Sequence, residues 1–378
     1  MLGDKFDKVK EIITLSFVED LLVKLISIKS FSGEEFDILR FIEKYARGMK
    51  INYSKQYVSD RRYNLILKSN NSSKKDILLN THLDTVPTFL EQQLRPYKKG
   101  DKIYGRGACD AKGSVTVMLI TFLALHKLKM LKKRHVTLAL MVGEENSGDG
   151  VATFIKNNCN YSLAIIGEPT GMKVASSQAG YLEFTIIAKS IPSHAFDPIG
   201  EQAIITMTDA INKINELIKK YFKSSNVFVR YIRGGNEDTY WYTRDICKST
   251  LLINTYPDSQ IKRLKEKISE LISKLNKNTK HVKISVHMED WDNGITLKKD
   301  LRDLKKLKKS FGEMKIPFGF MHLPSWTDGS TIASKKIPTF IFGPGFLKNA
   351  HTKFEHININ DVRDSALLLA NFLIKLQD

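Results

Sequence analysis

The stretch DILLNTHLDTVP (residues 76–87), followed by YGRGACDAKG (104–113), decides the fold of this chain. Its first half contains the short apolar run ILL, which is typical of a strand that is buried on both faces. His82 and Asp84 come directly after this run. Ligands bind at the carboxyl ends of the strands in an open α/β sheet, so we expect both side chains at such an edge.

A lone His-x-Asp pair is weak evidence for a site, but the same pattern returns three times along the chain. The apolar runs at 136–142, 163–167 and 338–345 each predict a further strand, and each is followed by acidic or imidazole side chains. Such a set at one edge of one sheet is typical of a metal site. Its members are Glu144, Glu145, Glu168, His351 and Glu355.

The length of 378 residues allows more than one hydrophobic core, because chains beyond roughly 250–300 residues tend to split into domains. From residue 180 the sequence pattern changes and predicts strands and two long helices in the order β-α-β-β-α-β. This order predicts a small two-layer α+β domain of ferredoxin-like type. The last apolar strand comes only after this unit. We therefore predict an outer domain at 1–179 and 292–378, with an inserted domain at 180–291.

Amphipathic helices are predicted at both ends of the outer domain. Two of them precede the first strand, at 4–27 and 34–48, and the apolar tail at 359–377 predicts a third that packs on the core. Ser32 and Glu35 have the spacing of a capping box, so we expect them to cap the second helix.

Any metal in this protein is expected to be held by histidine and carboxylate. The three cysteines, Cys109, Cys159 and Cys247, are scattered and form no CxxC pair, which argues against a disulfide framework and against thiolate zinc. Asp110 comes just before the apolar segment 113–130, which predicts a largely buried helix. The N–H groups and the dipole of a helix N-terminus favour an ionised carboxylate there.

The composition is that of a soluble globular protein, with 42% hydrophobic and 26% charged residues. The N-terminus carries charge throughout and has no apolar core followed by a cleavage site, so we infer no signal peptide. No apolar stretch reaches the roughly 20 residues that a membrane span needs. We expect a cytoplasmic protein with no membrane partner.

The net charge of +18 has two interpretations, a nucleic-acid partner or the attraction of acidic substrates. The densest basic segment, 298–310, has Leu301, Leu304 and Leu307 at helical spacing, which favours a solvated amphipathic helix. The sequence carries no zinc-finger, RNP or helix-turn-helix signature. We therefore expect no nucleic-acid partner, and a basic surface would suit an anionic acyl-amino acid.

The chain carries short motifs in a fixed order: NTHLDTVP, YGRGACDAKG, GEENSG, IGEPT, PSHAFDPIGEQAI, TDGSTI, GPG and AHTKFEHI. In this order and spacing they resemble the acetylornithine deacetylase and succinyl-diaminopimelate desuccinylase family of co-catalytic zinc hydrolases. That superfamily also includes aminoacylases, glutamate carboxypeptidase and carnosine-type dipeptidases. The resemblance covers nearly the whole chain. It implies an α/β zinc-peptidase-like catalytic domain with a mostly parallel sheet, and an inserted domain that serves as lid and dimerisation domain.

The resemblance implies two Zn²⁺ ions per subunit, for which Co²⁺ or Mn²⁺ are possible substitutes. Asp110 would bridge the two ions. His82 and Glu168 would complete one site, and Glu145 and His351 the other. Two zinc ions about 3.5–4 Å apart need a bridging carboxylate and positions that stay open for water and substrate, which this set provides.

The resemblance also implies three catalytic residues. Asp84 would accept a hydrogen bond from His82 and so fix the orientation of the ring. Glu144 would be the general base and acid, taking a proton from metal-bound water and delivering it to the leaving nitrogen. His194 matches a histidine that, in dimeric members, enters the active site of the partner subunit and holds the oxyanion. The alternative interpretation is that His194 is a loop histidine that caps the local backbone.

The favoured function is removal of the acyl group from an N-acyl amino acid in amino-acid biosynthesis, by a homodimer joined through the inserted domain. The alternatives are a metallo-dipeptidase or carboxypeptidase acting on short peptides, and a catalytically silent binding protein that keeps the fold. No ligand and no base is lost, which disfavours the silent protein.

The departures from the family pattern concern substrate recognition. Asn254 stands where many members carry an arginine that grips the substrate carboxylate, and Phe354 stands where Asn is usual. Arg230, Arg233 and Arg244 are the candidates to replace that arginine. The reaction class is therefore better defined by the sequence than the substrate.

Overall fold

The computed structural model contains two compact units. The first comprises Met1–Ser176, Leu297–His322 and Thr327–Asp378, and the second comprises Ser177–Thr296 and Leu323–Trp326. Most of the second unit is thus one continuous segment between two parts of the first. The residues that the structure describes are 2–69, 76–156, 161–194, 196, 202–235, 245–257, 261–297 and 302–377.

A sheet with parallel strands at its centre forms the middle of the first unit. β6 (Val136–Met141), β3 (Ile77–His82), β7 (Leu163–Ile166) and β15 (Thr339–Ile341) lie side by side in that order and run parallel. Antiparallel strands flank them: β1 (Asn52–Ser59) and β2 (Arg62–Lys68) beside β6, and β8 (Val174–Gln178) beside β15. The short strands β13 (Ile295–Thr296) and β14 (Phe320–Leu323) pair with β8.

The predicted apolar runs are the buried strands of this sheet. Every residue of β3, β6 and β7 is buried, as expected for strands that are covered on both faces. On one face their side chains join a single core with the helices, to which Leu79, Leu138 and Ile165 belong. Full burial of one such side chain contributes about 1.5–3 kcal/mol, so this core fixes the register of the strands that lead to the site.

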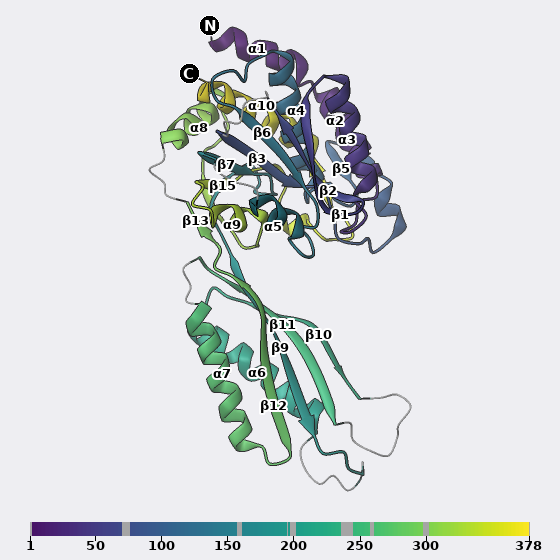
Figure 1. Cartoon of the computed structure of the whole chain (residues 1–378), viewed down its shortest axis with the longest axis vertical. Helices are drawn as coiled ribbons and strands as arrows, with labels where there is room; N and C mark the ends of the chain where they lie inside the picture. The colour runs from purple at the N-terminus through teal and green to yellow at the C-terminus, as the bar shows by residue number, and fades with distance from the viewer. Residues whose placement is uncertain are drawn as a thin grey trace. The chain divides into compact units, whose positions relative to one another are not determined.

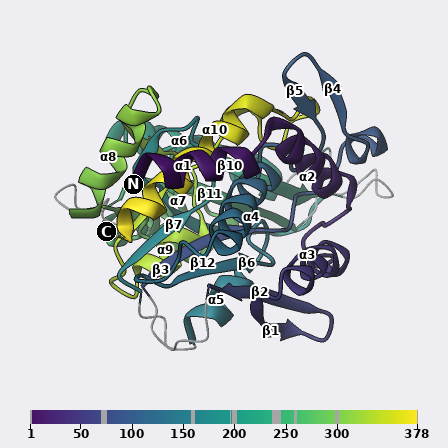
Figure 2. The ribbon, with the colours of Figure 1, turned by 90° about the horizontal axis from the view of Figure 1, so that it is seen from above.

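Helices cover both faces of the sheet. They are α1 (Leu2–Ile12), α2 (Leu15–Ser27), α3 (Phe36–Gly48), α4 (Lys112–Lys127), α5 (Asp149–Lys156), α8 (Arg302–Glu313), α9 (Asp328–Ala333) and α10 (Ile359–Leu376). Figure 1 shows α4 beside β3 and β6, with α10 packed against it. In Figure 2, α1, α10 and α4 lie close together near the middle of the view. No helix among the described residues is long and apolar enough to cross a membrane.

α4 is the most deeply buried of these helices in its first part. Residues 112–125 are all buried, which explains why this segment is apolar on every side rather than along one stripe. It begins directly after Asp110 and Ala111, as the sequence predicts. A small sheet of β4 (Tyr97–Lys99), β5 (Lys102–Tyr104) and β16 (His356–Asn358), with the short helices η1 (Glu91–Leu94) and η2 (Leu347–Asn349), completes the first unit.

The N-terminal segment differs from its prediction in two respects. The single helix expected at 4–27 is broken, because Thr14 accepts a hydrogen bond from the N–H of Phe17 at 3.2 Å and caps a new helix, α2. The capping box predicted for Ser32 and Glu35 is wrong. Glu35 precedes α3 without any side-chain capping bond, and both side chains make contacts with distant parts of the chain.

The second unit is a two-layer α+β structure. Its sheet has the order β10-β11-β9-β12 with antiparallel neighbours, and two helices pack on one face, as Figure 1 shows. Its elements are β9 (Gly180–Ser190), α6 (Ala203–Tyr221), β10 (Val227–Gly234), β11 (Ile246–Thr255), α7 (Ile261–Asn278) and β12 (Val282–Asp292). The predicted fold class, a mostly parallel α/β unit with an inserted two-layer α+β unit, is confirmed.

Candidate metal centre

Parallel strands bring four of the predicted residues to one edge of the first sheet. His82 is the last residue of β3, and Glu168 follows the end of β7. Glu144 and Glu145 follow β6, which pairs in parallel with β3. Since these three strands are neighbours, their carboxyl ends meet at the place where open α/β sheets bind ligands.

Asp110 lies between the two predicted histidines. Its Oδ1 is 3.2 Å from His82 Nε2, and its Oδ2 is 3.4 Å from His351 Nε2. His351 Nε2 is also 3.0 Å from Glu145 Oε1. His82 Nε2 is 3.7 Å from Glu168 Oε1. Each oxygen of one carboxylate therefore faces a different histidine, and each histidine has a further carboxylate beside it.

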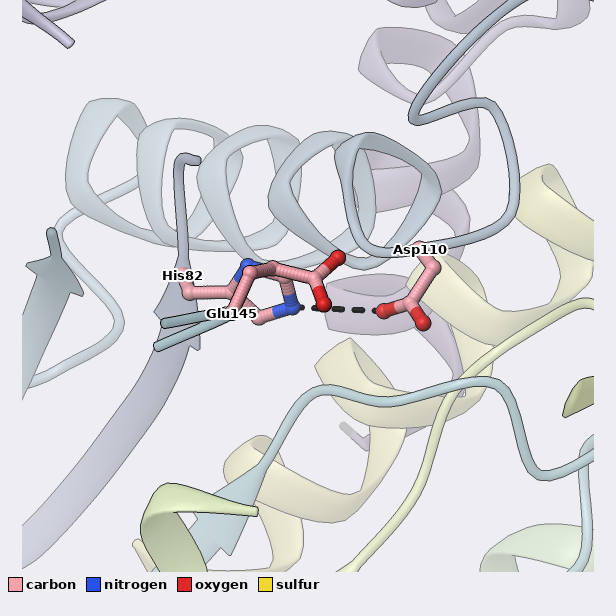
Figure 3. A group of neighbouring side chains, drawn as sticks. All are labelled: His82, Asp110 and Glu145. Carbon is pink, nitrogen blue, oxygen red and sulfur yellow. Dashed lines mark hydrogen bonds and ion pairs between the residues drawn. The ribbon is translucent and has the colours of Figure 1, made fainter. Parts of the chain in front are cut away.

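Figure 3 shows the ligand atoms of His82, Asp110 and Glu145 directed toward one another. One ligand atom from each of these residues lies within 4.8 Å of the other two. His82 is 1% exposed and Asp110 is 7% exposed, whereas the His351 side chain is 47% exposed. The cluster is therefore buried on the His82 side and open to solvent at His351, which gives a substrate a route to it.

The charged groups of the cluster shift one another's pKa values. Burial disfavours the charged form of His82, but the carboxylates of Glu144 and Glu168 outweigh it and raise the pKa of the ring well above its usual value. Burial, reinforced by acidic neighbours, raises the pKa of Glu144 and of Glu168 well above the usual value. Hydrogen bonds to its two carboxylate partners raise the pKa of His351 to about 10.

The donor set fits a pair of divalent cations. Four carboxylates and two imidazoles converge in a small, mostly buried space, and the acidic groups there are compensated only in part by the histidines. Carboxylate oxygen and imidazole nitrogen are the ligands that zinc, cobalt and manganese accept. A carboxylate with one oxygen toward each half of the cluster, as in Asp110, has the arrangement that a bridging ligand requires.

Asp84 holds the main chain of the glutamate pair. It is fully buried, and its carboxylate accepts the N–H of Glu144 at 3.1 Å, the N–H of Glu145 at 3.0 Å and the hydroxyl of Ser32 at 2.7 Å. Hydrogen bonds to a charged group contribute about 1.5–3 kcal/mol each, so this carboxylate strongly fixes the loop. His82 Nδ1 donates instead to the main-chain carbonyl of Asp84 at 3.0 Å, while the Asp84 carboxylate lies 3.6 Å from it, beyond hydrogen-bond range.

The Glu144 side chain is placed differently from that of its neighbour. Within the part of the chain that the structure describes, its carboxylate has no hydrogen-bond partner, whereas Glu145 Oε1 faces His351. Both glutamates lie in the turn at 144–147, and only Glu145 directs its carboxylate at the histidine. Glu144 lies close enough to His82 to raise the pKa of the ring and close enough to Glu168 for that carboxylate to raise the pKa of Glu144.

Glu355 supports the loop of Asp110 from the opposite side. Its Oε1 accepts the N–H groups of Cys109 at 3.0 Å and Asp110 at 3.1 Å, and its Oε2 accepts a hydrogen bond from Arg106. Arg106 and Glu355 are each 1% exposed. The strand-end pattern marked Glu355 as a possible member of the site, and the structure places it behind the main chain rather than among the facing oxygens. Nothing in the sequence marks Arg106 as the partner of Glu355, apart from its place in the motif YGRGACDAKG.

Three further residues at the site have no role in the sequence interpretation. Arg62 and Asp149 form an ion pair next to the glutamate loop. Asp328, which begins the helix of the TDGSTI motif, is 2% exposed, and burial raises its pKa to about 7. The motif order could have marked Asp328, but no local pattern marks the other two.

His194 lies in the second unit and makes a local contact. Its ring is exposed, and its Nδ1 accepts the N–H of Phe196 at 3.3 Å. This is the backbone contact expected of a loop histidine. The role of His194 in an active site therefore stays a prediction.

Asn254, which replaces the expected arginine, has a structural contact within the second unit. Its Oδ1 accepts the N–H of Asn226 at 2.6 Å and so ties β11 to the start of β10. Of the candidate replacements, Arg230 forms an ion pair with Glu183. Arg244 lies outside the described residues.

The chain belongs to peptidase family M20/M25/M40, whose family profile matches residues 78–375. It is therefore a hydrolase of the metallopeptidase type. A probable carboxypeptidase of Aspergillus clavatus is 26% identical over 377 residues, covering 92% of this chain and 85% of the relative. A peptidase M20 domain-containing protein of Schizosaccharomyces pombe is 26% identical over 89% of this chain and 79% of the relative. The predicted superfamily is thus confirmed at this coarser level.

Solved structures support the same fold. A tripeptidase from Staphylococcus aureus superposes with a TM-score of 0.83 at 17% identity, covering 97% of this chain and 99% of that chain. An M20 family metallo-carboxypeptidase from Sulfolobus solfataricus superposes with a TM-score of 0.76 at 17% identity, covering 94% of this chain and 98% of that chain. A dinuclear metal binding peptidase of the M20 family from Bacillus subtilis has a TM-score of 0.71 at 12% identity, covering 96% of this chain and 98% of that chain.

Proposed function

We propose that this chain is a dinuclear metal exopeptidase, a dipeptidase or carboxypeptidase that cleaves the amide bond of short peptides. The observation that carries the proposal is Asp110, whose two oxygens face His82 and His351. The names of several similar proteins, among them carboxypeptidases, dipeptidases and a tripeptidase, support peptides as the substrate class. On sequence alone this function is the alternative to deacylation, and these names favour it.

The proposed ligands divide into two sets that share Asp110. His82 and Glu168 would hold one divalent cation, and Glu145 and His351 the other, with zinc as the expected ion and Co²⁺ or Mn²⁺ as substitutes. When bound, such a pair polarises an amide carbonyl and lowers the pKa of water toward about 7.

The residues of the chain have distinct tasks in the proposed hydrolysis. Glu144, whose carboxylate has no hydrogen-bond partner among the described residues, takes a proton from the attacking water and passes it to the leaving nitrogen. Asp84 keeps Glu144 and Glu145 in place through their N–H groups.

Deacylation of N-acyl amino acids is the second candidate. Its specific support is the order of motifs, from NTHLDTVP to AHTKFEHI, which resembles the acetylornithine deacetylase and succinyl-diaminopimelate desuccinylase family. The two candidates share one set of metal ligands and one base. They differ in the acyl side of the bond that is cleaved.

A substrate panel separates the candidates. Protein reconstituted in turn with Zn²⁺, Co²⁺ and Mn²⁺ would be assayed on dipeptides, tripeptides and N-acetyl and N-succinyl amino acids. We expect kcat/KM for at least one peptide to exceed that for every N-acyl amino acid by about 10-fold or more, because pocket contacts set such ratios. The reverse order would favour deacylation. Hydrolysis of no compound with any of the metals would favour the silent binding protein.

We further propose a homodimer in which His194 of each subunit serves the site of the other. Mixing inactive Glu144→Gln and His194→Ala proteins, with subunit exchange, is the test. In a mixed two-fold dimer only one site keeps both residues, so activity should return to roughly a quarter of the wild-type value. No recovery, with exchange of subunits demonstrated, would remove His194 from a role across the dimer.

A further inference from the structure

A series of hydrogen bonds and ion pairs runs along the loop that carries Glu144 and Glu145. On one side, the Asp84 carboxylate accepts the N–H groups of both glutamates at 3.1 and 3.0 Å. Asp84 also accepts the hydroxyl of Ser32 at 2.7 Å. The main chain of the glutamate pair is therefore tied to the turn that precedes α3.

Glu35 continues the series from this turn. Its Oε1 accepts the N–H of Gly33, the residue directly after Ser32, at 3.0 Å. Arg62 donates two hydrogen bonds to the Glu35 carboxylate, from Nε at 3.0 Å and from Nη2 at 3.1 Å. Because Glu35 is fully buried, the arginine provides the charge that its carboxylate needs there.

Arg62 extends the series to Asp149, the first residue of α5. Its Nη1 donates to Asp149 Oδ2 at 2.7 Å and its Nη2 to Oδ1 at 3.2 Å. Gly143, which directly precedes Glu144, lies against this ion pair. A Cβ built on Gly143 would be 2.1 Å from Asp149 Oδ1 and 2.7 Å from Arg62 Nη2, and its φ of +74° favours glycine. The pair therefore rests directly on the backbone that leads into Glu144.

Asn64 holds the base of the same loop. Its Oδ1 accepts the N–H of Val142 at 3.3 Å, and its Nδ2 donates to the carbonyl of Gly150 at 2.8 Å. One side chain thus joins the two ends of the loop, while the ion pair supports the segment between them. The loop is fixed from β2, from the turn before α3 and from α5.

We propose that Arg62 and Asp149 are positioning residues that hold the backbone at Gly143, so that Glu145 faces His351 and Glu144 stays free. Glu144 and Glu145 follow Gly143 directly in the turn at 144–147, so a small rotation of the backbone at Gly143 would turn both glutamates away from their places. The effect on turnover rests on the proposed function. The effect on the loop itself does not, because it can be measured without metal or substrate.

Two conservative substitutions test the proposal. Asp149→Asn removes the charge next to Gly143 and leaves Arg62 paired with the buried Glu35. Arg62→Lys keeps the charge, but a lysine lacks the planar fork that bonds two carboxylates at once. Asp60→Asn and Arg61→Lys are matched controls, because both residues are exposed neighbours in the turn between β1 and β2.

We expect either test variant to lower kcat by about 10–100-fold with KM changed by less than about 2-fold, since small misplacement of a catalytic group has effects of this size. The double variant should lose no more than the worse single variant, because both changes break the same link. In metal-free protein, hydrogen exchange at the N–H groups of residues 144–145 should be at least about 10-fold faster than in wild type. The controls should match wild type in every measurement.

The proposal would be overturned if Asp149→Asn and Arg62→Lys both matched the controls in kcat and in hydrogen exchange at residues 144–145. A loss of kcat that follows a loss of bound metal or of Tm, with unchanged exchange at residues 144–145, would also overturn it, because that pattern indicates general destabilisation. If the wild-type protein hydrolyses no substrate, the proposed function fails. Faster exchange at residues 144–145 would then still support the positioning role, and unchanged exchange would still contradict it.

Discussion

Glu144→Gln is expected to lower kcat by about 10²–10⁴-fold while the protein still binds its metal ions. Glutamine has the size of glutamate but lacks a basic oxygen, so the variant cannot take up and release the proton. The loop should keep its place, because it is the main-chain N–H of Glu144, not its carboxylate, that bonds Asp84. The measurement is kcat and KM on the best substrate of the panel, with metal content determined on the same samples.

Glu216→Gln, a change at an exposed glutamate of α6, is the matched control and should leave kcat at the wild-type value. Retention of more than about a tenth of wild-type kcat in Glu144→Gln would remove Glu144 from the role of general base. A loss of metal from the variant would instead assign Glu144 to the ligands.

Asp110→Ala is expected to weaken the binding of both metal ions by more than about 100-fold, beyond the 10–100-fold typical of residues that only orient ligands. The reason is that its two oxygens face the two halves of the cluster, toward His82 and toward His351. Metal content after gel filtration, and titration of the metal-free protein, would measure the loss. Activity should fall with it.

Asp101→Ala provides the control for this change, because Asp101 is an exposed carboxylate in the turn between β4 and β5. A folded Asp110→Ala protein that retains one ion at wild-type affinity would show that the sites are independent. Metal content near wild type for both ions would contradict the bridge altogether.

The strands and their terminal residues could be predicted from sequence because burial on both faces forces an unbroken apolar run. β3, β6 and β7 are such runs, and the polar residues that end them stand out against them. The sheet then brings the ends together by rule, since parallel neighbours share an edge. Hence the amino-acid sequence is sufficient to expect His82, Glu145 and Glu168 at one place.

The supports of the site could not be predicted, because their partners are far apart in the chain. Ser32 and Glu35 have the local spacing of a capping box, yet Ser32 bonds Asp84 and Glu35 pairs with Arg62. Arg62 meets Asp149 across a separation of 87 residues, for which no short pattern exists. Ser32 and Glu35 could have capped the helix locally, but their side chains instead bond partners that are distant in the chain. Such long-range contacts compete with local capping for the same polar side chains.

The proposed function requires that the chain hold two cations, one on either side of Asp110. Anomalous diffraction from crystals of the zinc-loaded protein, recorded on both sides of the zinc edge, tests it most directly. We expect two peaks about 3.5–4 Å apart, one next to His82 and Glu168 and the other next to Glu145 and His351. Peaks at other places would contradict the two-cation site. The absence of zinc peaks at this cluster, in protein that zinc activates, would contradict it as well.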